Sequence, residues 1–178
     1  MKRYKNIVLF LIKFLTVYFV MVIGYNFYLN KSQQKTDSFS CSSITATVAK
    51  QTTTVLTFFT YDVDYLQHEK EMSVKLLINN QYTARVTEGC NSISIIILFI
   101  AFIVAFTGSI KATVLYTVFG SLLIYGINIL RIAFLTIMIY KYPEHQEFLH
   151  NLIFPAIIYG TIFLLWVLWV HKFSNHKK

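Results

Sequence analysis

The sequence is poor in charged residues and in cysteine. Only 13% of its 178 residues are charged, whereas 56% are hydrophobic and are gathered in long runs. This composition excludes an ordinary soluble domain and indicates an integral membrane protein. There are two cysteines, and the spacing of Cys90 with His145 and His150 is not a recognised metal-ligand pattern. No carboxylate is clearly placed to complete such a site, so we expect no metal and no other cofactor.

The hydrophobic runs predict an all-α membrane fold with about four transmembrane helices, over residues 7–28, 93–110, 112–140 and 152–170. The first run is about 33 Å of helix, enough to cross a hydrocarbon core of about 30 Å. A signal peptide is the alternative here, but the run is long and no clear small-x-small cleavage site follows, which favours a retained anchor. The third run is about 43 Å of helix, so it must tilt, kink or protrude.

The charges that flank these runs are asymmetric. If the N-terminus is inside, the inner flanks hold no acidic residue, whereas basic and acidic residues nearly balance on the outer side. The positive-inside rule therefore predicts cytoplasmic N- and C-termini. The net charge of +8 is a topology signal, and no nucleic-acid partner is expected. The inner basic residues are Lys2, Arg3, Lys5, Lys111, Lys172, Lys177 and Lys178.

This topology divides the chain into four parts. They are a cytoplasmic basic tail with the first anchor at 1–29, an extracytoplasmic segment at 30–89, a transmembrane core at 90–171 and a cytoplasmic tail at 172–178.

The extracytoplasmic segment is predicted to be a small α+β unit. Residues 31–43 are typical of a polar linker, and residues 44–61, rich in Thr, Val and Phe, fit an interfacial helix or a strand. Residues 73–78 and 81–87 have strand patterns on either side of an Asn-Asn pair, which tolerates the positive φ of a two-residue turn. We therefore expect a hairpin that leads directly to Cys90.

Three residues whose side chains are unfavourable in hydrocarbon are predicted to lie at the same depth in the membrane. Cys90 precedes the second run by three residues, and His150 precedes the fourth by two. Arg131 lies about 28 Å along the third run from its inner end, close to the outer interface. A nearby helix N-terminus and an arginine both favour a thiolate. The pattern predicts a thiol active site at the outer rim of the membrane.

Each of these residues also has a structural interpretation. Cys90 could form a disulfide with Cys41, since both are on the outer, oxidising side. Arg131 could pair with Glu88 or with helix-end carbonyls, and Asn128, one turn earlier, could hold it in place. His145 competes with His150 as a general acid and base. The alternative function is a noncatalytic envelope assembly protein with a Cys41–Cys90 disulfide and a structural Arg131.

Three short motifs, in order, carry a family resemblance. They are Glu-Gly-Cys-Asn-Ser-Ile at 88–93, Asn-Ile-Leu-Arg-Ile at 128–132 and Phe-Leu-His-Asn at 148–151, followed by a last run that contains Tyr159 and Gly160. Together they resemble the exosortase/archaeosortase family of membrane cysteine transpeptidases, and the small size is most similar to the short type F exosortase branch. Many members of that family continue the cysteine motif with Ser-Gly or Ala-Gly, where this chain has Asn91 and Ser92.

The resemblance implies a protein-sorting enzyme of the bacterial inner membrane whose active site faces the periplasm. Its partners would be the lipid bilayer and membrane-anchored protein substrates with a C-terminal sorting signal, made of a motif, a transmembrane helix and a basic tail. Cys90 would be the nucleophile that forms a thioester, Arg131 would stabilise the oxyanion or the substrate, and His150 would be the general acid and base, with Asn128 and Glu88 in support. Water as acceptor would make the enzyme a protease, and an amine would make it a transpeptidase.

Overall fold

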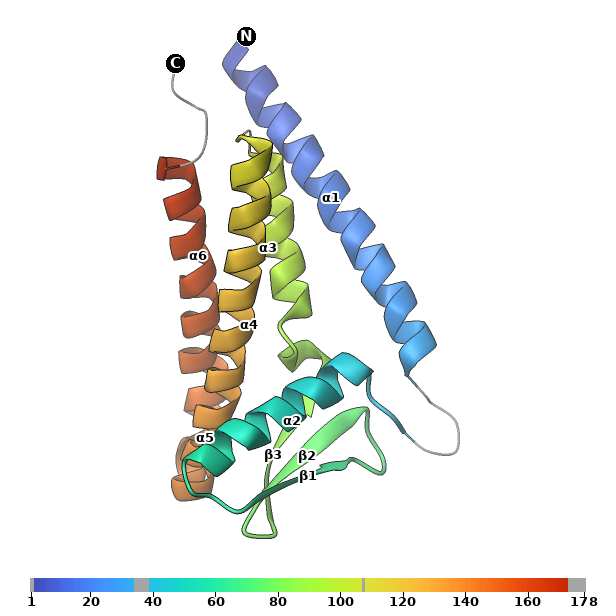
Figure 1. Ribbon diagram of the computed structural model, residues 1–178, viewed down its shortest axis with the longest axis vertical. Coiled ribbons are helices and arrows are strands. Elements are labelled where there is room, and N and C mark those ends of the chain that lie inside the picture. The colour runs from blue at the N-terminus through green and yellow to red at the C-terminus, as the bar shows by residue number, and fades with distance from the viewer. Residues whose placement is uncertain (1, 34–38, 107, 173–178) are drawn as a thin grey trace.

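Four helices run along the long axis of the molecule and form its helical body. The computed structural model describes residues 2–33, 39–106 and 108–172. The predicted tail beyond Lys172, with Lys177 and Lys178, and residues 34–38 of the predicted polar linker lie outside this part of the chain. The body consists of α1 (Lys2–Ser32), α3 (Ile93–Ala105), α4 (Ile110–Lys141) and α6 (Phe154–Lys172). The start of α1 and the end of α6 lie at the same end of the body (Figure 1).

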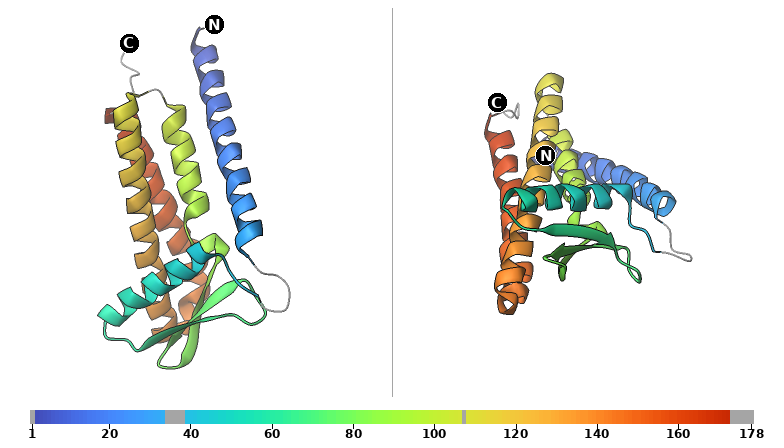
Figure 2. Two further views of the ribbon diagram at one scale, coloured as in Figure 1. Left: turned by 45° about the vertical axis from the view of Figure 1, so that its right-hand side comes forward. Right: turned by 60° about the horizontal axis from the view of Figure 1, so that its bottom comes forward.

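A small cap lies at the opposite end of the body (Figures 1 and 2). It consists of helix α2, which crosses the ends of the long helices, and an antiparallel three-stranded sheet of order β1-β2-β3. The elements of the cap are α2 (Ser43–Phe58), β1 (Val63–Gln67), β2 (Ser73–Ile78) and β3 (Gln81–Thr87). The mostly helical membrane fold with a small α+β segment is therefore confirmed.

Within the residues that the structure describes, three helices are long and apolar enough to cross a membrane: α1, α4 and the continuous helical segment from Pro143 to Lys172. The predicted end of the second span, residue 110, is wrong, because α3 stops at Ala105 after 13 residues. That length is about 20 Å of helix, less than a hydrocarbon core. Phe106 is already extended, and Ser109 caps the start of α4 by accepting from the backbone N–H of Ala112 at 3.3 Å.

The predicted hairpin is confirmed at both of its strands, β2 and β3. Asn79 and Asn80 form the two-residue turn with positive φ angles of 50° and 61°, and Ile78 pairs with Gln81. The side-chain amide of Asn79 donates to the hydroxyl of Tyr140 at 3.0 Å. The turn of the hairpin is therefore fixed to the last turn of α4.

The Thr-rich segment at residues 44–61, whose sequence fits either a helix or a strand, forms the helix α2 over most of its length. Ser42 caps it by accepting from the backbone N–H of Thr45. Threonine hydroxyls inside the helix donate to carbonyls three or four residues earlier, as Thr52 does to Val48 at 2.8 Å. Strand β1 was not predicted from the sequence, because four of its five residues are exposed and give little hydrophobic signal.

Two separate hydrophobic clusters stabilise the two parts. The cap cluster joins α2, β2 and β3 to Ile132 of α4, and Cys90 packs against it. The body cluster joins α3, α4 and α6, with the ring of Phe102 stacked on Trp166 at 4.3 Å and Phe99 buried beside them. Phe10 of α1 reaches this cluster through the ring of Phe106 at 4.6 Å.

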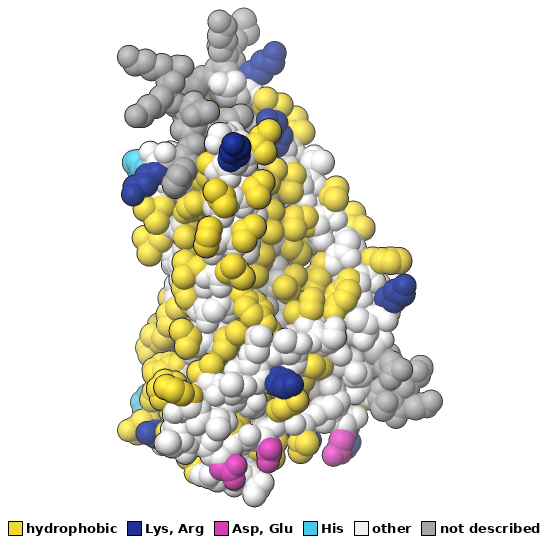
Figure 3. Space-filling view, in the orientation of Figure 1, with side chains coloured by type: hydrophobic (Ala, Val, Ile, Leu, Met, Phe, Trp, Pro, Cys, Tyr) yellow, Lys and Arg dark blue, Asp and Glu magenta, His cyan; other side chains and the backbone are white. Residues whose placement is uncertain are grey.

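The outer surface of the helical body is largely hydrophobic. Figure 3 shows a broad apolar surface on this face between basic side chains at the end that holds the start of α1 and acidic side chains at the cap. Such a surface is expected where lipid replaces water. The fold is that of an integral membrane protein.

Candidate active site

The nucleophile candidate lies at the junction of the cap and the helical body. Cys90 is half-buried and ends the short 3-10 helix η1 (Glu88–Cys90), which directly follows β3. The side-chain amide of Asn128 donates to the Cys90 carbonyl at 2.7 Å, and the Thr87 hydroxyl lies 3.4 Å from the Cys90 sulfur. The buried Val86 fixes the end of β3 in the cap cluster. Cys90 is thus held both by the cap and by α4.

A tight turn separates Cys90 from helix α3. The Asn91 side chain accepts from the backbone N–H of Ile93 at 3.0 Å and so satisfies one free donor at the helix start. Ser92 has a left-handed φ of 64° and no capping hydrogen bond through its side chain. A backbone of this kind favours glycine, which is the residue that the family resemblance leads one to expect at this position. The asparagine also donates to the Tyr25 hydroxyl at 2.7 Å, which connects the turn to α1.

Glu88 has a different role from the ion pair considered from the sequence. Its carboxylate accepts from the backbone N–H of Ser42 at 2.6 Å and from the Thr45 hydroxyl at 2.5 Å, at the N-terminus of α2. Burial alone would raise the pKa of Glu88, but hydrogen bonds from Thr45, Ser42 and Gln33 outweigh it and hold the pKa below its usual value. Glu88 joins the segment before Cys90 to α2.

Arg131 projects from α4 and is half-buried. Among the residues that the structure describes, the ion pairs are Arg85–Glu71 and His145–Glu144, so Arg131 has no carboxylate partner there. Its guanidinium is instead within electrostatic range of the Cys90 sulfur and the Tyr159 hydroxyl. The expected contact between Asn128 and Arg131 is replaced by the bond from Asn128 to the Cys90 carbonyl. The positive charge of Arg131 is therefore available to a substrate beside the thiol.

His150 lies in a π-helical turn, η3 (Leu149–Ile153), between α5 (Gln146–Phe148) and α6. Insertions of this kind in helices are frequent at functional sites. The side chain is exposed. The competing His145 belongs to η2 (Pro143–His145), where it pairs with Glu144 at 3.4 Å and contacts the ring of Tyr142.

One cavity brings the three predicted site residues together. It has a volume of about 910 Å³, and Cys90, Arg131 and His150 all line it, whereas His145 does not. Apolar side chains of α4, namely Ile132, Leu135 and Ile139, form part of its wall. The three chemical groups therefore share one space at the end of the helical body that carries the cap.

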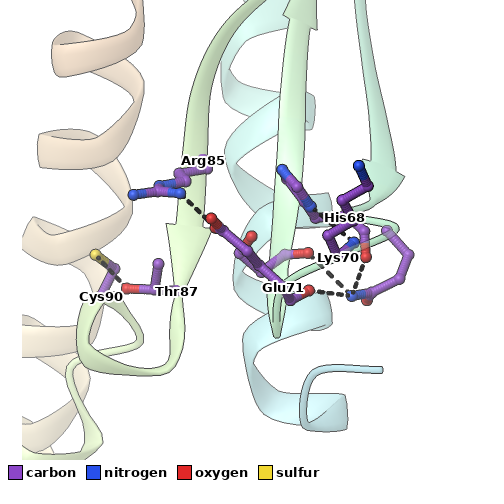
Figure 4. A network of polar contacts seen from close by, with 8 residues as sticks. His68, Lys70, Glu71, Arg85, Thr87 and Cys90 are labelled. Atoms are coloured by element: carbon purple, nitrogen blue, oxygen red, sulfur yellow. Dashed lines mark hydrogen bonds and ion pairs between the residues drawn. The ribbon is translucent and has the colours of Figure 1, made fainter. Parts of the chain in front are cut away.

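Two residues beside Cys90 were missed by the sequence analysis. Figure 4 shows Arg85 of β3 on the same side of the strand as Cys90, in an ion pair with Glu71, and Thr87 next to the sulfur. Both residues line the cavity. The alternation of the predicted strand could have revealed them, since positions 85 and 87 face away from the buried Val86.

Cys41 is a buried free thiol, and so is not bonded to Cys90. Its sulfur donates to the side-chain oxygen of Gln67 at 3.3 Å. Burial, followed by the charge of Glu88, raises the pKa of the Cys41 thiol. The disulfide of the alternative interpretation is thus not formed in this structure, and a buried thiol with a raised pKa is a poor nucleophile.

Residues 6–170 match the family described as transmembrane exosortase. The chain belongs to the transmembrane exosortase family. No curated protein and no solved structure matches the chain. The exosortase family is one of membrane protein-sorting transpeptidases, which act on membrane-anchored substrates that carry sorting signals. Within the described residues of this exosortase, no group of three His, Cys, Asp or Glu side chains could hold a metal ion.

Proposed function

We propose that this exosortase is a cysteine transpeptidase or protease that cleaves C-terminal sorting signals at the outer face of the inner membrane. One observation carries the proposal: a thiol, a guanidinium and an imidazole from three elements line the same cavity. Of the two cysteines, the one in this cavity is Cys90, while Cys41 is buried in the cap. The family assignment independently supports protein sorting.

The first chemical step would form a thioester. His150 takes the proton of the Cys90 thiol, and the sulfur attacks the scissile carbonyl carbon of the substrate. Arg131 stabilises the negative charge that develops on the carbonyl oxygen. When the intermediate collapses, the C–N bond breaks, and His150 returns the proton to the leaving amine of the tail.

The second step would release the sorted protein. Water or an amine acceptor gives a proton to His150 and attacks the thioester carbonyl, and the C–S bond breaks to regenerate Cys90. Water yields a free carboxylate, whereas an amine yields a new amide bond. Arg131 acts in both steps because each passes through an oxyanion.

The proposed topology has four membrane-embedded helices, with both termini in the cytoplasm and the cap in the periplasm. The common end of α1 and α6 and the basic residues gathered there support this orientation (Figures 1 and 3). Helix α3 packs against α1, α4 and α6 and has an apolar sequence throughout, which supports its place in the bilayer as a fourth, short segment.

The substrate would be anchored beside the enzyme. A tail made of a short motif, a transmembrane helix and a basic end would place its motif at the membrane surface, at the level of the cavity. A cavity at the junction of the cap and the body suits a peptide bond presented just above a membrane helix.

The test is to co-express the enzyme with a tagged candidate substrate that has such a tail and to follow loss of its C-terminal helix by mass. Wild type should remove the tail, and Cys90→Ala should not. Arg131→Ala should slow cleavage by about 10²–10³-fold, the usual loss when an oxyanion donor is removed. His150→Ala should lose about 10²–10⁴-fold, the usual contribution of a general acid and base.

His145→Ala is the matched control, because it changes a histidine five residues away that does not line the cavity. It should cleave like wild type. Loss of activity in His145→Ala with normal activity in His150→Ala would assign the acid and base to the other histidine. A substrate tail still processed by Cys90→Ala would reject the thiol mechanism.

A further inference from the structure

Strand β3 is an edge strand that borders the candidate site. In the described part of the chain the sheet has the order β1-β2-β3, so the side of β3 away from β2 carries no further strand. Six of the seven residues of β3 line the cavity that contains Cys90, and the seventh, Val86, is buried in the cap cluster. The unpaired backbone edge and the candidate nucleophile therefore share one space.

An edge of this kind is a template for an extended peptide. Its free N–H and C=O groups can pair with the backbone of another chain, and in this mode of binding the main-chain hydrogen bonds provide the affinity while alternate side chains provide the specificity. The edge is also preformed. Val86 fixes it to the cap cluster, the Arg85–Glu71 ion pair braces it, and the hairpin turn is bonded to Tyr140 of α4.

The direction of β3 matches the path that a membrane-anchored substrate must follow. The strand runs from the hairpin turn, at the far end of the cap, toward the start of α3 in the helical body (Figures 1 and 2). Cys90 follows three residues after its last residue, Thr87. A substrate whose chain passes from its outer domain into a transmembrane helix runs the same way, and a parallel alignment brings its membrane-proximal end to the thiol.

We propose that β3 binds the segment before the scissile bond of the substrate as an added parallel strand. This inference rests on the proposed function, because it concerns the same site. In a parallel pair every second residue of the bound peptide directs its N–H and C=O to β3. Its side chains alternate between the two faces of the extended sheet. Those on the face toward α4 meet Ile132, Leu135 and Ile139, so apolar side chains should be preferred at alternate positions.

Disulfide crosslinking tests the register without requiring catalysis. Arg85→Cys and Thr87→Cys are each introduced into the Cys90→Ala enzyme, and single cysteines are scanned through the six residues before the scissile bond of the tagged substrate that wild type cleaves. The register of the β2–β3 pairing shifts between Leu76 and Leu77 of β2. Arg85 and Thr87 lie in the regularly paired part of β3. The best partner of Thr87→Cys should be two residues closer to the scissile bond than that of Arg85→Cys.

The control for the crosslinks is Leu66→Cys on β1, at the opposite edge of the sheet, where the side chain is 56% exposed. It should give no crosslink. A shift of two residues in the opposite direction, or equal yields at all substrate positions, would overturn the parallel strand. If the wild-type enzyme does not cleave the tail at all, the proposed function fails, and this is seen before any crosslink is made.

A proline scan of the same substrate tests the backbone bonds with the wild-type enzyme. Proline removes the N–H, so cleavage should fall about tenfold or more at every second position, where an acceptor on β3 would lose its donor. Alanine at the same positions separates the side-chain effect from the backbone effect. A proline profile that follows the alanine profile, without alternation, would refute strand addition.

Discussion

The cap and the helical body are stabilised by different interactions. The cap region buries the polar side chains of Ser42, Thr45 and Asn91, and all three donate hydrogen bonds to the carboxylate of Glu88. The body instead packs aromatic rings and small residues, such as Phe99 against Gly120, and exposes apolar side chains around its circumference. The stability of the cap therefore depends on specific hydrogen bonds, whereas that of the body depends on close packing of its side chains.

The candidate site lies where these two kinds of structure meet. Cys90 follows strand β3 of the cap, Arg131 lies on α4 of the body, and His150 lies in η3, directly before α6. The hydrogen bond from Asn128 to the Cys90 carbonyl is a direct polar contact between the two sides. Changes on either side of the junction should therefore alter activity for different physical reasons.

The two cysteines give the largest expected contrast. Cys90→Ala should reduce cleavage on the order of 10⁶-fold, the effect of removing a nucleophile in a well-studied protease, with little change in stability. Cys41→Ala should retain cleavage and lower the free energy of unfolding by about 1 kcal/mol, because a buried side chain in the cap cluster becomes smaller. Tail release and thermal unfolding in detergent measure the two effects. Equal activity loss in both variants would contradict the separation of roles.

The close packing of α3 on α4 gives the next largest effect. A Cβ at Gly120 would lie 2.3 Å from the ring of Phe99, whereas a Cβ at Gly126 has nothing within 4 Å. Gly120→Ala should therefore lower the free energy of unfolding of the body by about 1–3 kcal/mol, the usual cost of overpacking. Thermal unfolding of the detergent-solubilised protein measures this change.

Gly126→Ala is the matched control for this contact, since it adds the same methyl group to the same helix. It should be neutral or slightly stabilising, because alanine is the better helix former. Two variants with equal melting temperatures would mean that the contact between α3 and α4 is looser than the structure indicates.

The hydrogen bonds of Glu88 should make the stability of the cap depend on pH. The pKa of Glu88 is lowered on folding, so its carboxylate stabilises the cap above the ordinary Glu pKa of about 4.3, and this stability is lost as the pH falls through the folded pKa. Glu88→Gln should cost about 1–3 kcal/mol at neutral pH, because buried donors lose a charged acceptor. Unfolding measured between pH 7 and acid should show the difference shrinking at low pH. A constant difference across that range would argue against a charged Glu88.

Local chemistry explains which parts of the cap were predictable. The Asn79–Asn80 pair determined the hairpin, because positive φ at two successive residues is a requirement that the neighbouring strands do not alter. The Thr-rich segment was ambiguous because β-branched residues fit a strand, and its helix depends on Ser42 and on Glu88, which is 46 residues away from that serine. Partners so distant leave no periodic signal in the sequence.

In the helical body, too, contacts between segments that are distant in the sequence could not be predicted. The positions of α1, α4 and α6 along the chain followed from the hydrophobic runs, and Cys90, Arg131 and His150, which the sequence predicts at one level, line a common cavity. The end of α3 at Ala105 was missed, because the run of uncharged residues continues to Ile110 and the turn signal of Gly108 and Ser109 inside it was not used. The partner of Asn128 was missed because helical spacing indicates neighbours on the same helix and gives no information about the neighbouring segment.

The smallest expected effect concerns the turn that joins the two parts. Ser92 has a φ of 64°, which costs a residue with a Cβ about 1–2 kcal/mol, and its hydroxyl donates to the Asn91 carbonyl at 2.6 Å. Ser92→Gly removes the strain but also the hydroxyl, so stability should rise by less than about 1 kcal/mol. Ser92→Ala keeps the Cβ and loses the hydroxyl, and should fall below wild type. The order Gly, Ser, Ala in melting temperature would show that the backbone conformation determines the preference for glycine here, whereas a lower value for Gly than for Ala would show that the turn is not strained.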